Sequence, residues 1–318
     1  MSKYIIKKVL LGLLTIFIIL TVVFILIRQL PTDYFFTSDQ LTKLSQEEKD
    51  MILQSSGLKD PMLTQLVNYY GNLFSGEFGI SRRIQAGLPV TELIGSRIGV
   101  SLRLGIISLL LAVTLGVLMG TVQTLCKDKF GDHLGTAFIV LIDAVPTVVS
   151  FSLIMVFGSS VLGLPSVYSS RVHPVTSLIM PVLCMSLPSI AGYALWTRRH
   201  MVDQLNKDYI KLARMKGMSN LEILTKHVLR NAIVPLVQYL PTSLLFTIGG
   251  SMLVETFFSI PGMGSLFTTA IQRYDLDVVQ TLMLIYSAMS VGGIILGDLL
   301  MAAVDPRIKL GDKKEVTR

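Results

Sequence analysis

Three acidic residues, Asp143, Glu255 and Asp298, stand alone within long apolar stretches of the sequence. Carboxylates at membrane depth can carry protons or sodium ions, or they can make polar contacts between helices. An ion-coupled carrier usually needs a chain of ionisable residues through its helices, and isolated acids do not provide one. For each of the three we therefore expect helix capping or a polar contact between helices.

Other residue types that support chemistry lack the neighbours they would need. Cys126 and Cys184 have no His or Cys partners nearby in the sequence, so we interpret them as buried apolar side chains. The four histidines fall in or next to predicted loops: His133, His173, His200 and His227. The sequence contains no GxxxxGK[ST] phosphate loop, HExxH motif or Ser/His/Asp arrangement. We therefore expect no enzyme activity, and no metal or cofactor bound by this chain.

The elements that carry these residues are predicted to be membrane helices. The 318 residues are 51% apolar and 15% charged, with a mean hydropathy of +0.63, which does not suit a water-facing surface. Six runs have about the length that crosses a bilayer as a helix: 9–27, 102–125, 136–162, 178–196, 233–258 and 279–304. No small-x-small cleavage site follows the first run, so we interpret it as a retained anchor rather than a signal peptide. The predicted fold class is an all-α membrane protein with six transmembrane helices.

The distribution of Lys and Arg predicts the orientation. With a cytoplasmic N-terminus, the inner segments 1–8, 126–134, 198–231 and 305–318 hold three, two, eight and five Lys or Arg residues. The short outer loops hold one each, Arg171 and Arg273, and the long segment 28–98 holds seven but weighs little in this rule. Both termini are therefore predicted to be cytoplasmic. The net charge of +7 reflects this bias, and no basic cluster with aromatic residues indicates nucleic-acid binding.

Two predicted spans carry small residues one helical turn apart. These are Gly116 with Gly120, and Gly293 with Gly297. Small residues at this spacing let helix backbones approach closely in lipid. The four glycines are candidate packing positions, within the bundle or against a partner.

The most polar long stretch of the C-terminal half, "KLARMKGMSNLEILTKHVLRNAI", begins with signals for a short helix. Asp208 would lie near the positive N-terminal end of this helix, with Arg214 and Lys216 near the negative C-terminal end. Gly217 can then take the left-handed conformation that ends a helix. A helix that stops at a glycine corner is predicted here.

A second helix is predicted to start directly after the corner. Ser219 and Glu222 have the spacing of a capping box, in which each satisfies a free backbone amide of the other. The helix pair could lie on the inner membrane surface, held by lysines near anionic lipid. Alternatively, its tight corner and the neighbouring Ala213 and Met218 could insert into a groove on a partner protein.

The segments "DYIKLARMKGMS" and "HVLRNAIVP" resemble the cytoplasmic signature loop of permease subunits of binding-protein-dependent ABC importers, in the subclass that carries oligopeptides, dipeptides and nickel. Lys211 and Leu212 stand where the family consensus has Glu and Ala, whereas Ala213 and Gly217 match it. Further segments are similar in the same order over nearly the whole chain: "GEFGISRRIQAGLPVTELIGSRI", "LIDAVPTVVSF", "LGLP", "TRRHMVDQLNKDY", "VETFFSIPGMGSL" and "DPRIKL".

This resemblance implies a type I ABC importer permease fold that is membrane-embedded and contacts lipid. Its expected partners are a second homologous permease, two ABC ATPase subunits that carry ATP and Mg²⁺, and an extracytoplasmic substrate-binding protein. It further implies that the corner couples to the ATPases through the following residues: Asp208, Tyr209, Ala213, Lys216, Gly217, Met218, Ser219 and Glu222. Ala213 is expected to fit against the partner.

The chain is expected to divide into four parts. Residues 1–30 form the N-terminal segment and first helix, and 31–98 form an extracytoplasmic segment. Residues 99–310 form a five-helix core with the cytoplasmic coupling loop at 198–231, and 311–318 form a cytoplasmic tail.

The segment "VETFFSIPGMGSLFTTAIQRYD" is a candidate outer gate. Pro261, Gly262 and Gly264 allow a sharp chain reversal after Glu255. Leu266, Phe267, Ala270 and Ile271 follow at helical spacing, typical of a short helix that packs back against the bundle. An interfacial helix without a gating role is the alternative.

The sequence leaves the transported substrate open. An importer of oligopeptides or dipeptides is the leading hypothesis, and nickel or metal-chelate uptake is the alternative within the same family. A self-sufficient channel, an ion-coupled carrier or a structural membrane scaffold are alternatives from other classes.

Overall fold

The computed structural model describes residues 2–249 and 251–304. Within these ranges the regular secondary structure is helical, apart from an isolated bridge between Ile80 and Pro89. The helices, in chain order, are α1 (Ser2–Arg28), η1 (Thr32–Phe35), α2 (Ser38–Lys43), α3 (Gln46–Ser55), α4 (Met62–Phe74), α5 (Val90–Leu125), α6 (Phe130–Ala144), α7 (Thr147–Ser160), α8 (Thr176–Leu205), α9 (Asp208–Met215), α10 (Asn220–Glu222), the π-helical η2 (Ile223–Leu229), α11 (Arg230–Ile248), α12 (Met252–Phe257), α13 (Met263–Gln272) and α14 (Leu276–Val304). The expected tail 311–318 and the segment "DPRIKL" lie outside the described residues.

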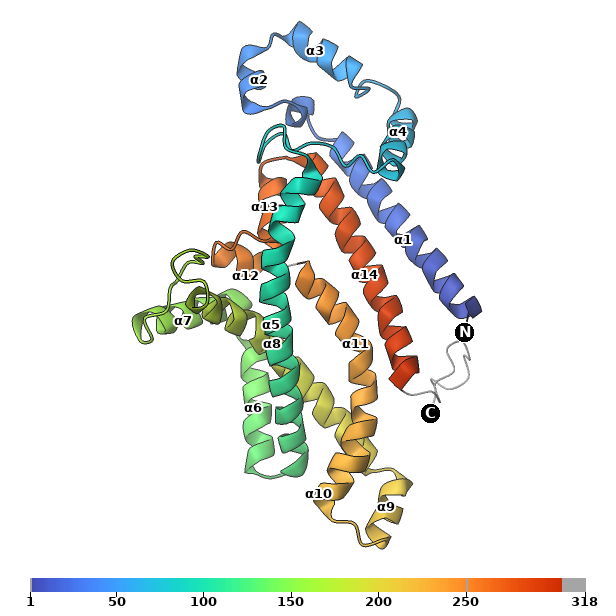
Figure 1. Cartoon of the computed structure of the whole chain (residues 1–318), viewed down its shortest axis with the longest axis vertical. Helices are drawn as coiled ribbons and strands as arrows, with labels where there is room; N and C mark the ends of the chain where they lie inside the picture. Colours follow the sequence, from blue (N-terminus) through green and yellow to red (C-terminus); the bar gives the residue numbers. More distant parts are fainter. Residues whose placement is uncertain (1, 250, 305–318) are drawn as a thin grey trace.

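Long apolar helices form the body of the molecule. Among the described residues, five segments are long and apolar enough to cross a membrane: Tyr4–Arg28, Val90–Leu125, Thr176–Leu205, Asn220–Phe257 and Leu276–Val304. The pair α6 and α7 makes a sixth if the two helices count as one broken span. In Figure 1, α5, α8, α11 and α14 form the central bundle, with α1 beside α14.

The predicted span 136–162 is not one continuous helix. α6 and α7 meet at an angle of 107°, so α7 turns away from the long axis that α6 follows (Figure 1). The break lies at Val145 and Pro146, where Val145 is extended at φ −85° and ψ 126°. A residue before proline is disfavoured in the helical region, and proline itself has no N–H to continue the helix, so the chain bends here.

The predicted span 233–258 is also interrupted. α11 ends at Ile248 and a separate short helix, α12, begins at Met252. Ser251 caps the new helix, its hydroxyl accepting a hydrogen bond from the Val254 amide at 3.3 Å. The C-terminal end of this run is therefore a separate short helix rather than a continuation of α11.

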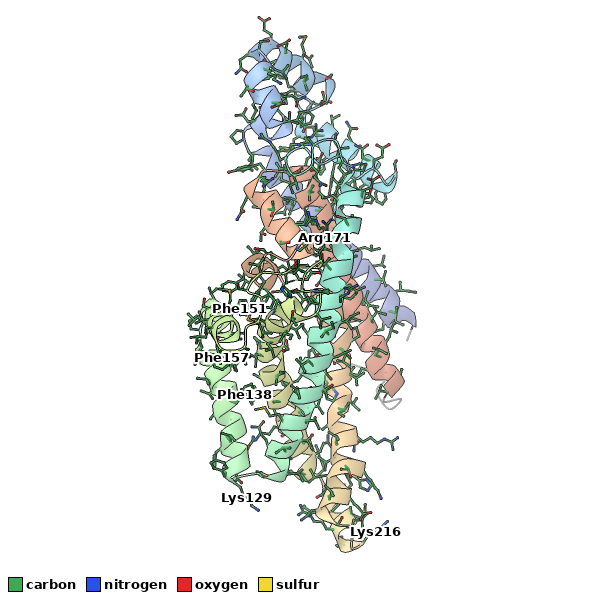
Figure 2. All side chains as sticks on the ribbon, turned by 60° about the vertical axis from the view of Figure 1, so that its left-hand side comes forward. Lys129, Phe138, Phe151, Phe157, Arg171 and Lys216 are labelled. Carbon is green, nitrogen blue, oxygen red and sulfur yellow. The ribbon has the colours of Figure 1, made fainter. Side chains whose placement is uncertain are left out.

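Polar segments gather at the two ends of the molecule. The helices α2, α3 and α4 lie at one end, and α9 and α10 lie at the opposite end (Figure 1). Figure 2 shows Lys129 and Lys216 at the end that carries α9 and α10, with Arg171 displaced towards the other. The segment after the first helix and the basic corner thus belong to opposite ends of the bundle.

Glycines bring the central helices close together. A side chain at Gly116 or Gly120 would overlap α8, because the position of a Cβ would be 2.9 Å from the Ile190 carbonyl oxygen and 2.5 Å from that of Ala194. At Gly297 the corresponding distance to the α11 carbonyl of Gln238 is 2.2 Å. Gly293 similarly approaches the α11 backbone, at 2.9 Å from the Thr242 Cα. Both small-residue pairs therefore lie at seams inside the bundle, which is the close approach that their spacing predicts.

Asp298 joins three helices. Its carboxylate on α14 accepts hydrogen bonds from Tyr4 of α1 at 3.0 Å and from Gln238 of α11 at 3.1 Å, and it pairs with Lys8 of α1. This is the polar contact between helices that the sequence predicts. Asp143, by contrast, lies exposed at the end of α6 and makes no contact of this kind with another described residue.

Candidate functional site

The corner between α9 and α10 is built by local backbone signals. Gly217 has φ +79°, the left-handed conformation that the sequence predicts. Its amide donates to the Arg214 carbonyl at 3.0 Å, and the Met218 amide donates to the Ala213 carbonyl at 3.3 Å. This pair of bonds is the Schellman motif, which satisfies the last carbonyls of a helix. The chain therefore leaves α9 in a defined direction.

A capping box starts the second helix of the corner. The Glu222 amide donates to the Ser219 hydroxyl at 3.3 Å, and the Glu222 carboxylate accepts from the Ser219 amide at 3.4 Å. The helix continues through the π-helical η2 into α11, so the corner is in direct helical connection with the central bundle. π-helical segments inside α-helices are rare and are frequently found at functional sites.

An apolar cluster fixes the corner to the rest of the chain. Ile210 and Ala213 of α9 are buried with Met201 of α8 and Val228 of η2, and Met218 packs against the same cluster. Ala213 is only 7% exposed. The side chains of Ala213 and Met218 contribute to the contact between α9 and its own chain, with Met218 half-buried, and the expected fit of these two residues against a partner stays a prediction.

The outward face of the corner is apolar and basic. Leu212, Met215 and Leu221 are 51%, 77% and 62% exposed, and Lys216 is exposed beside them. Figure 2 shows Lys216 at the extreme end of the molecule. We call Leu212, Met215 and Leu221 the corner face. An exposed apolar face with a basic rim has the composition of a protein contact surface.

Tyr209 connects the two helices that enter and leave the corner. Its hydroxyl donates to the Gln204 side chain of α8 at 2.8 Å and accepts from the Asn231 side chain of α11 at 3.1 Å. Next to it, Lys211 donates to Asp208 at 2.8 Å, and this hydrogen bond lowers the pKa of the Asp208 carboxyl from its ordinary value. The ends of α8 and α11 are thus linked through one side chain of α9.

At the other side of the bundle, Glu255 of α12 is fully buried and bound to two further elements. Its carboxylate accepts from the Ser101 hydroxyl of α5 at 2.6 Å and from the Ser265 amide of α13 at 3.0 Å. The Ser101 hydroxyl in turn accepts from the Met263 amide at 2.8 Å. A buried carboxylate is stable only when such donors surround it, so Glu255 fastens α12 and α13 to α5.

Gly262 and Gly264 are needed because other atoms of the segment pack closely against their Cα atoms. A Cβ at Gly262 would be 2.4 Å from the Glu255 carboxyl carbon, and one at Gly264 would be 2.7 Å from the Met252 amide nitrogen. Gly262 has φ −108° and ψ −171°, so it is not the residue that reverses the chain by a left-handed conformation. Ser259, with φ +54°, takes that conformation instead. The expected role of these glycines in the reversal is corrected accordingly.

Two further candidate gate residues differ in their surroundings. Pro261 is exposed in the loop between α12 and α13. Phe267 is partly buried and packs its ring edge-on against Tyr286 of α14, with ring centroids 5.5 Å apart. Phe267 therefore faces its own chain rather than an open outer surface.

Asp275 is a structural residue that sequence reasoning missed. It is buried, and its carboxylate accepts from the Ser81 hydroxyl at 2.6 Å and from the amides of Arg82, Arg83 and Ile84 at 3.0 to 3.1 Å. The turn between α13 and α14 is thereby joined to the loop that precedes α5. The only sequence signal was an acid directly after "QRY", which does not reveal a partner nearly 200 residues away.

A second missed contact lies at the opposite end. Arg198 of α8 donates two hydrogen bonds to Asp132 of α6, at 2.6 and 2.7 Å. This bidentate geometry fixes the start of α6 against α8. Lys129 begins the same turn and lies at the end that carries the corner (Figure 2).

Comparison with known proteins extends these observations. Residues 112–310 match the family described as the binding-protein-dependent transport system inner membrane component. The chain is 34% identical to the dipeptide transport system permease protein DppB of Lactococcus lactis, covering 98% of this chain and all of that protein. It is 32% identical to the oligopeptide transport system permease protein AppB of Bacillus subtilis and 31% identical to the oligopeptide transport system permease protein OppB of Salmonella typhimurium, each over 97% of this chain and all of the relative.

The match covers the C-terminal part of α5 together with α8, the corner, α11, the Glu255 segment and α14 in one continuous range. It agrees with the helical architecture and the apolar spans, so the prediction of an all-α membrane permease is confirmed. The chain belongs to the family of inner membrane components of binding-protein-dependent transport systems.

Proposed function

We propose that this chain is a permease subunit of an ATP-driven importer of oligopeptides or dipeptides. It forms half of the translocation pathway with a second, homologous permease, and an extracytoplasmic binding protein delivers the substrate. Two ATPase subunits bind ATP and Mg²⁺, and this chain binds no cofactor. The names of three relatives that align over their whole length, all peptide transport permeases, support the peptide substrate.

The observation that carries the coupling role is the corner face. Leu212, Met215 and Leu221 are exposed at one end of the molecule, on a corner whose shape is set by buried contacts with α8 and η2. Exposed apolar side chains on a corner that buried contacts hold in place suit insertion into a groove of another protein. We assign this groove to the ATPase subunits.

The charge distribution supports an orientation with both termini in the cytoplasm. Lys129 and Lys216 lie at the same end of the molecule (Figure 2), and α1 starts on the side of the bundle where α14 ends (Figure 1). Basic residues concentrate on the cytoplasmic side of membrane proteins. The segment 31–98, whose last residues belong to α5, is then extracytoplasmic, where a binding protein can reach it.

The segment formed by α12 and α13 is proposed as the outer gate. It lies beyond the end of α11, and one buried carboxylate holds it against α5. Apolar side chains, Val254 of α12 and Met263 of α13 among them, also pack in clusters shared with α5, and packed elements of this kind can switch between two discrete arrangements.

The polar contacts of the buried acids are evidence against an ion-coupled carrier. Glu255 and Asp298 are each bound to side chains of other helices, and Lys8 neutralises Asp298. Among the described residues no cluster of three or more His, Cys, Asp or Glu could hold a metal ion, and no structural observation favours nickel over peptides.

Substitution of the corner face tests the proposal. Leu212→Asp with Met215→Asp should prevent copurification of the ATPase subunits and abolish uptake of a labelled peptide by the reconstituted transporter. Leu63→Asp is the matched control, since Leu63 is 73% exposed on α4 at the opposite end. Copurification and uptake at the wild-type level in the double variant would contradict the coupling role.

A further inference from the structure

A cavity of about 280 Å³ lies among α5, α8 and α11, and it is not part of the contacts described above. α5 contributes Ser108, α8 contributes Ser189 and Tyr193, and α11 contributes Tyr239 and Ser243. Most of the residues that line it carry a hydroxyl group, and none carries a charge. This composition is unusual for the interior of an apolar bundle, where unpaired hydroxyl groups cost free energy.

One of these hydroxyl groups has no partner. Ser108 is 2% exposed, and its hydroxyl makes no hydrogen bond to any described residue. A serine within a helix can bond the carbonyl four residues earlier, as Thr121 and Thr124 of the same helix do. Ser108 instead leaves its donor and acceptor available at the cavity.

A second cavity adjoins the first. It has about 330 Å³, lies between α5, α8 and α11, and is lined mainly by aliphatic residues such as Val117, Leu236 and Leu240. Tyr193 lines both cavities, and its hydroxyl donates to Ser243 at 3.1 Å. A hydroxyl-rich compartment and an apolar compartment therefore meet at one tyrosine.

We propose that this pair of cavities binds the peptide in transit, with the hydroxyl groups bonded to its backbone and the apolar compartment holding a side chain. This inference rests on the proposed function. Hydroxyl groups both donate and accept, and they rotate to suit either an N–H or a C=O group. Since every peptide shares these backbone groups, such a site accepts many sequences. The absence of charge among the lining residues means that neither peptide terminus is required for binding.

The position of the cavities suits a site in the pathway. Ser101, which holds the outer segment through Glu255, is seven residues before Ser108 on α5, which places the two about 10 Å apart along the helix and on the same face. The other two walls, α8 and α11, continue to the corner, where Tyr209 links them. The site thus lies between the proposed gate and the proposed ATPase contact.

The size of the cavities limits what they can hold. Each is near the lower bound of small-molecule sites, at about 300 Å³. Tyr239 and Phe246 are 53% and 62% exposed at the hydroxyl-lined cavity, so it is open on the α11 side. A short part of a longer peptide can therefore occupy it while the rest extends outwards.

Protection of an introduced thiol tests direct binding. Ser189→Cys places an exposed thiol in the hydroxyl-lined cavity, in a background with Cys126 and Cys184 replaced by alanine. In the assembled transporter turning over ATP, saturating transported peptide should slow labelling by a small thiol reagent several-fold. Ser152→Cys, at a half-exposed position of α7 that does not line either cavity, is the control, and peptide should not change its labelling. Equal labelling of Ser189→Cys with and without peptide would overturn the proposal.

Removal of single hydroxyl groups tests the chemistry. Tyr193→Phe and Ser108→Ala should each raise the KM for peptide uptake roughly tenfold, the effect of losing about one hydrogen bond, with little change in kcat. Ser186→Ala, on α8 but bonded to its own helix, should leave the KM unchanged.

A peptide analogue with ester in place of amide groups should protect Ser189→Cys less than the parent peptide. Blocking both peptide termini should leave the protection of Ser189→Cys unchanged.

The outcomes separate this inference from the proposed function. Failure of the wild-type transporter to take up any peptide would reject the proposed function. Peptide uptake by the wild type, together with an unchanged KM in Tyr193→Phe and Ser108→Ala, would reject this site alone. If Ser189→Cys fails to assemble, Phe246→Cys, at a 62% exposed position of the same cavity, serves in its place with the same expected protection.

Discussion

Gly217 contributes to the corner through its backbone conformation alone. It has φ +79°, and a Cβ built on it would meet no atom within 4 Å. Space is therefore available for a side chain, and only the conformational cost opposes substitution. For an L-residue this cost is about 1–2 kcal/mol, lower for Asn and higher for β-branched residues.

Substitution of Gly217 separates conformation from bulk. Gly217→Val should abolish peptide uptake while the two permeases still assemble, because valine resists the left-handed conformation that directs α9 into α10. Gly217→Asn should retain most uptake, since asparagine tolerates that conformation. Uptake and pull-down of the partner permease measure the two effects, and wild-type uptake by Gly217→Val would refute the role of the corner.

Removal of the Glu255 carboxylate should destabilise the outer segment. Glu255→Ala leaves the Ser101 hydroxyl and the Ser265 amide without their acceptor, at a cost of about 1–3 kcal/mol for each buried group. The thermal unfolding midpoint of the purified complex should fall by several degrees. Glu255→Gln should lose less, because one amide oxygen still accepts. Glu92→Ala, at an exposed position of α5, is the control, and an equal midpoint for Glu255→Ala and Glu92→Ala would contradict this account.

At the scale of elements, local signals were predictable and long-range contacts were not. The left-handed glycine and the capping box depend on neighbouring residues, so the sequence predicts both the end of α9 and the start of α10. Ala213 is different: whether its helix face turns to α8 or to a partner depends on how α9 packs. The bend at Pro146 was missed for the same reason, because proline can also be accommodated inside a membrane helix, as Pro181 is in α8.

The residues of the candidate sites likewise divide into those that a local sequence pattern predicts and those that depend on long-range contacts. Asp275 and Asp132 bind partners that are distant in the sequence or on another helix, and no periodic pattern reveals such pairs. The hydroxyl-lined cavity also combines three helices whose relative rotation the sequence does not specify. The Gly116 and Gly293 seams were predictable, since the spacing of small residues is itself the signal for close packing.

If α12 and α13 form the outer gate, locking them to α5 should stop transport. The Met263 amide lies 2.8 Å from the Ser101 hydroxyl, so cysteines at these two positions are close enough for crosslinking. Oxidation of the Ser101→Cys/Met263→Cys variant should block peptide uptake, and a reductant should restore it. Each single cysteine variant serves as the control for loss of the native contact, and uptake undiminished by complete crosslinking would exclude a gate that separates from α5.

At the scale of the whole molecule, the two polar ends predict a labelling pattern. In a background without Cys126 and Cys184, Asp60→Cys should react with an impermeant thiol reagent in intact cells, whereas Asn220→Cys should react only after permeabilisation. Both positions are exposed: Asp60 lies between α3 and α4 and Asn220 begins α10, and these elements lie at opposite ends of the bundle (Figure 1). Ser265 is a poor probe of the outer side, because it is partly buried and bonded to Glu255. Labelling of Asn220→Cys in sealed cells would reverse the proposed orientation.

The separation of buried and exposed residues at the corner bears on compatibility between transport systems. Ile210 and Ala213 hold the shape of the corner from inside, whereas Leu212, Met215 and Leu221 present apolar atoms outwards. The outward residues can therefore change without refolding the corner, so partner choice and corner architecture can vary independently. Exchange of these three side chains between related permeases would then transfer recognition of an ATPase, leaving the substrate pathway of the recipient intact.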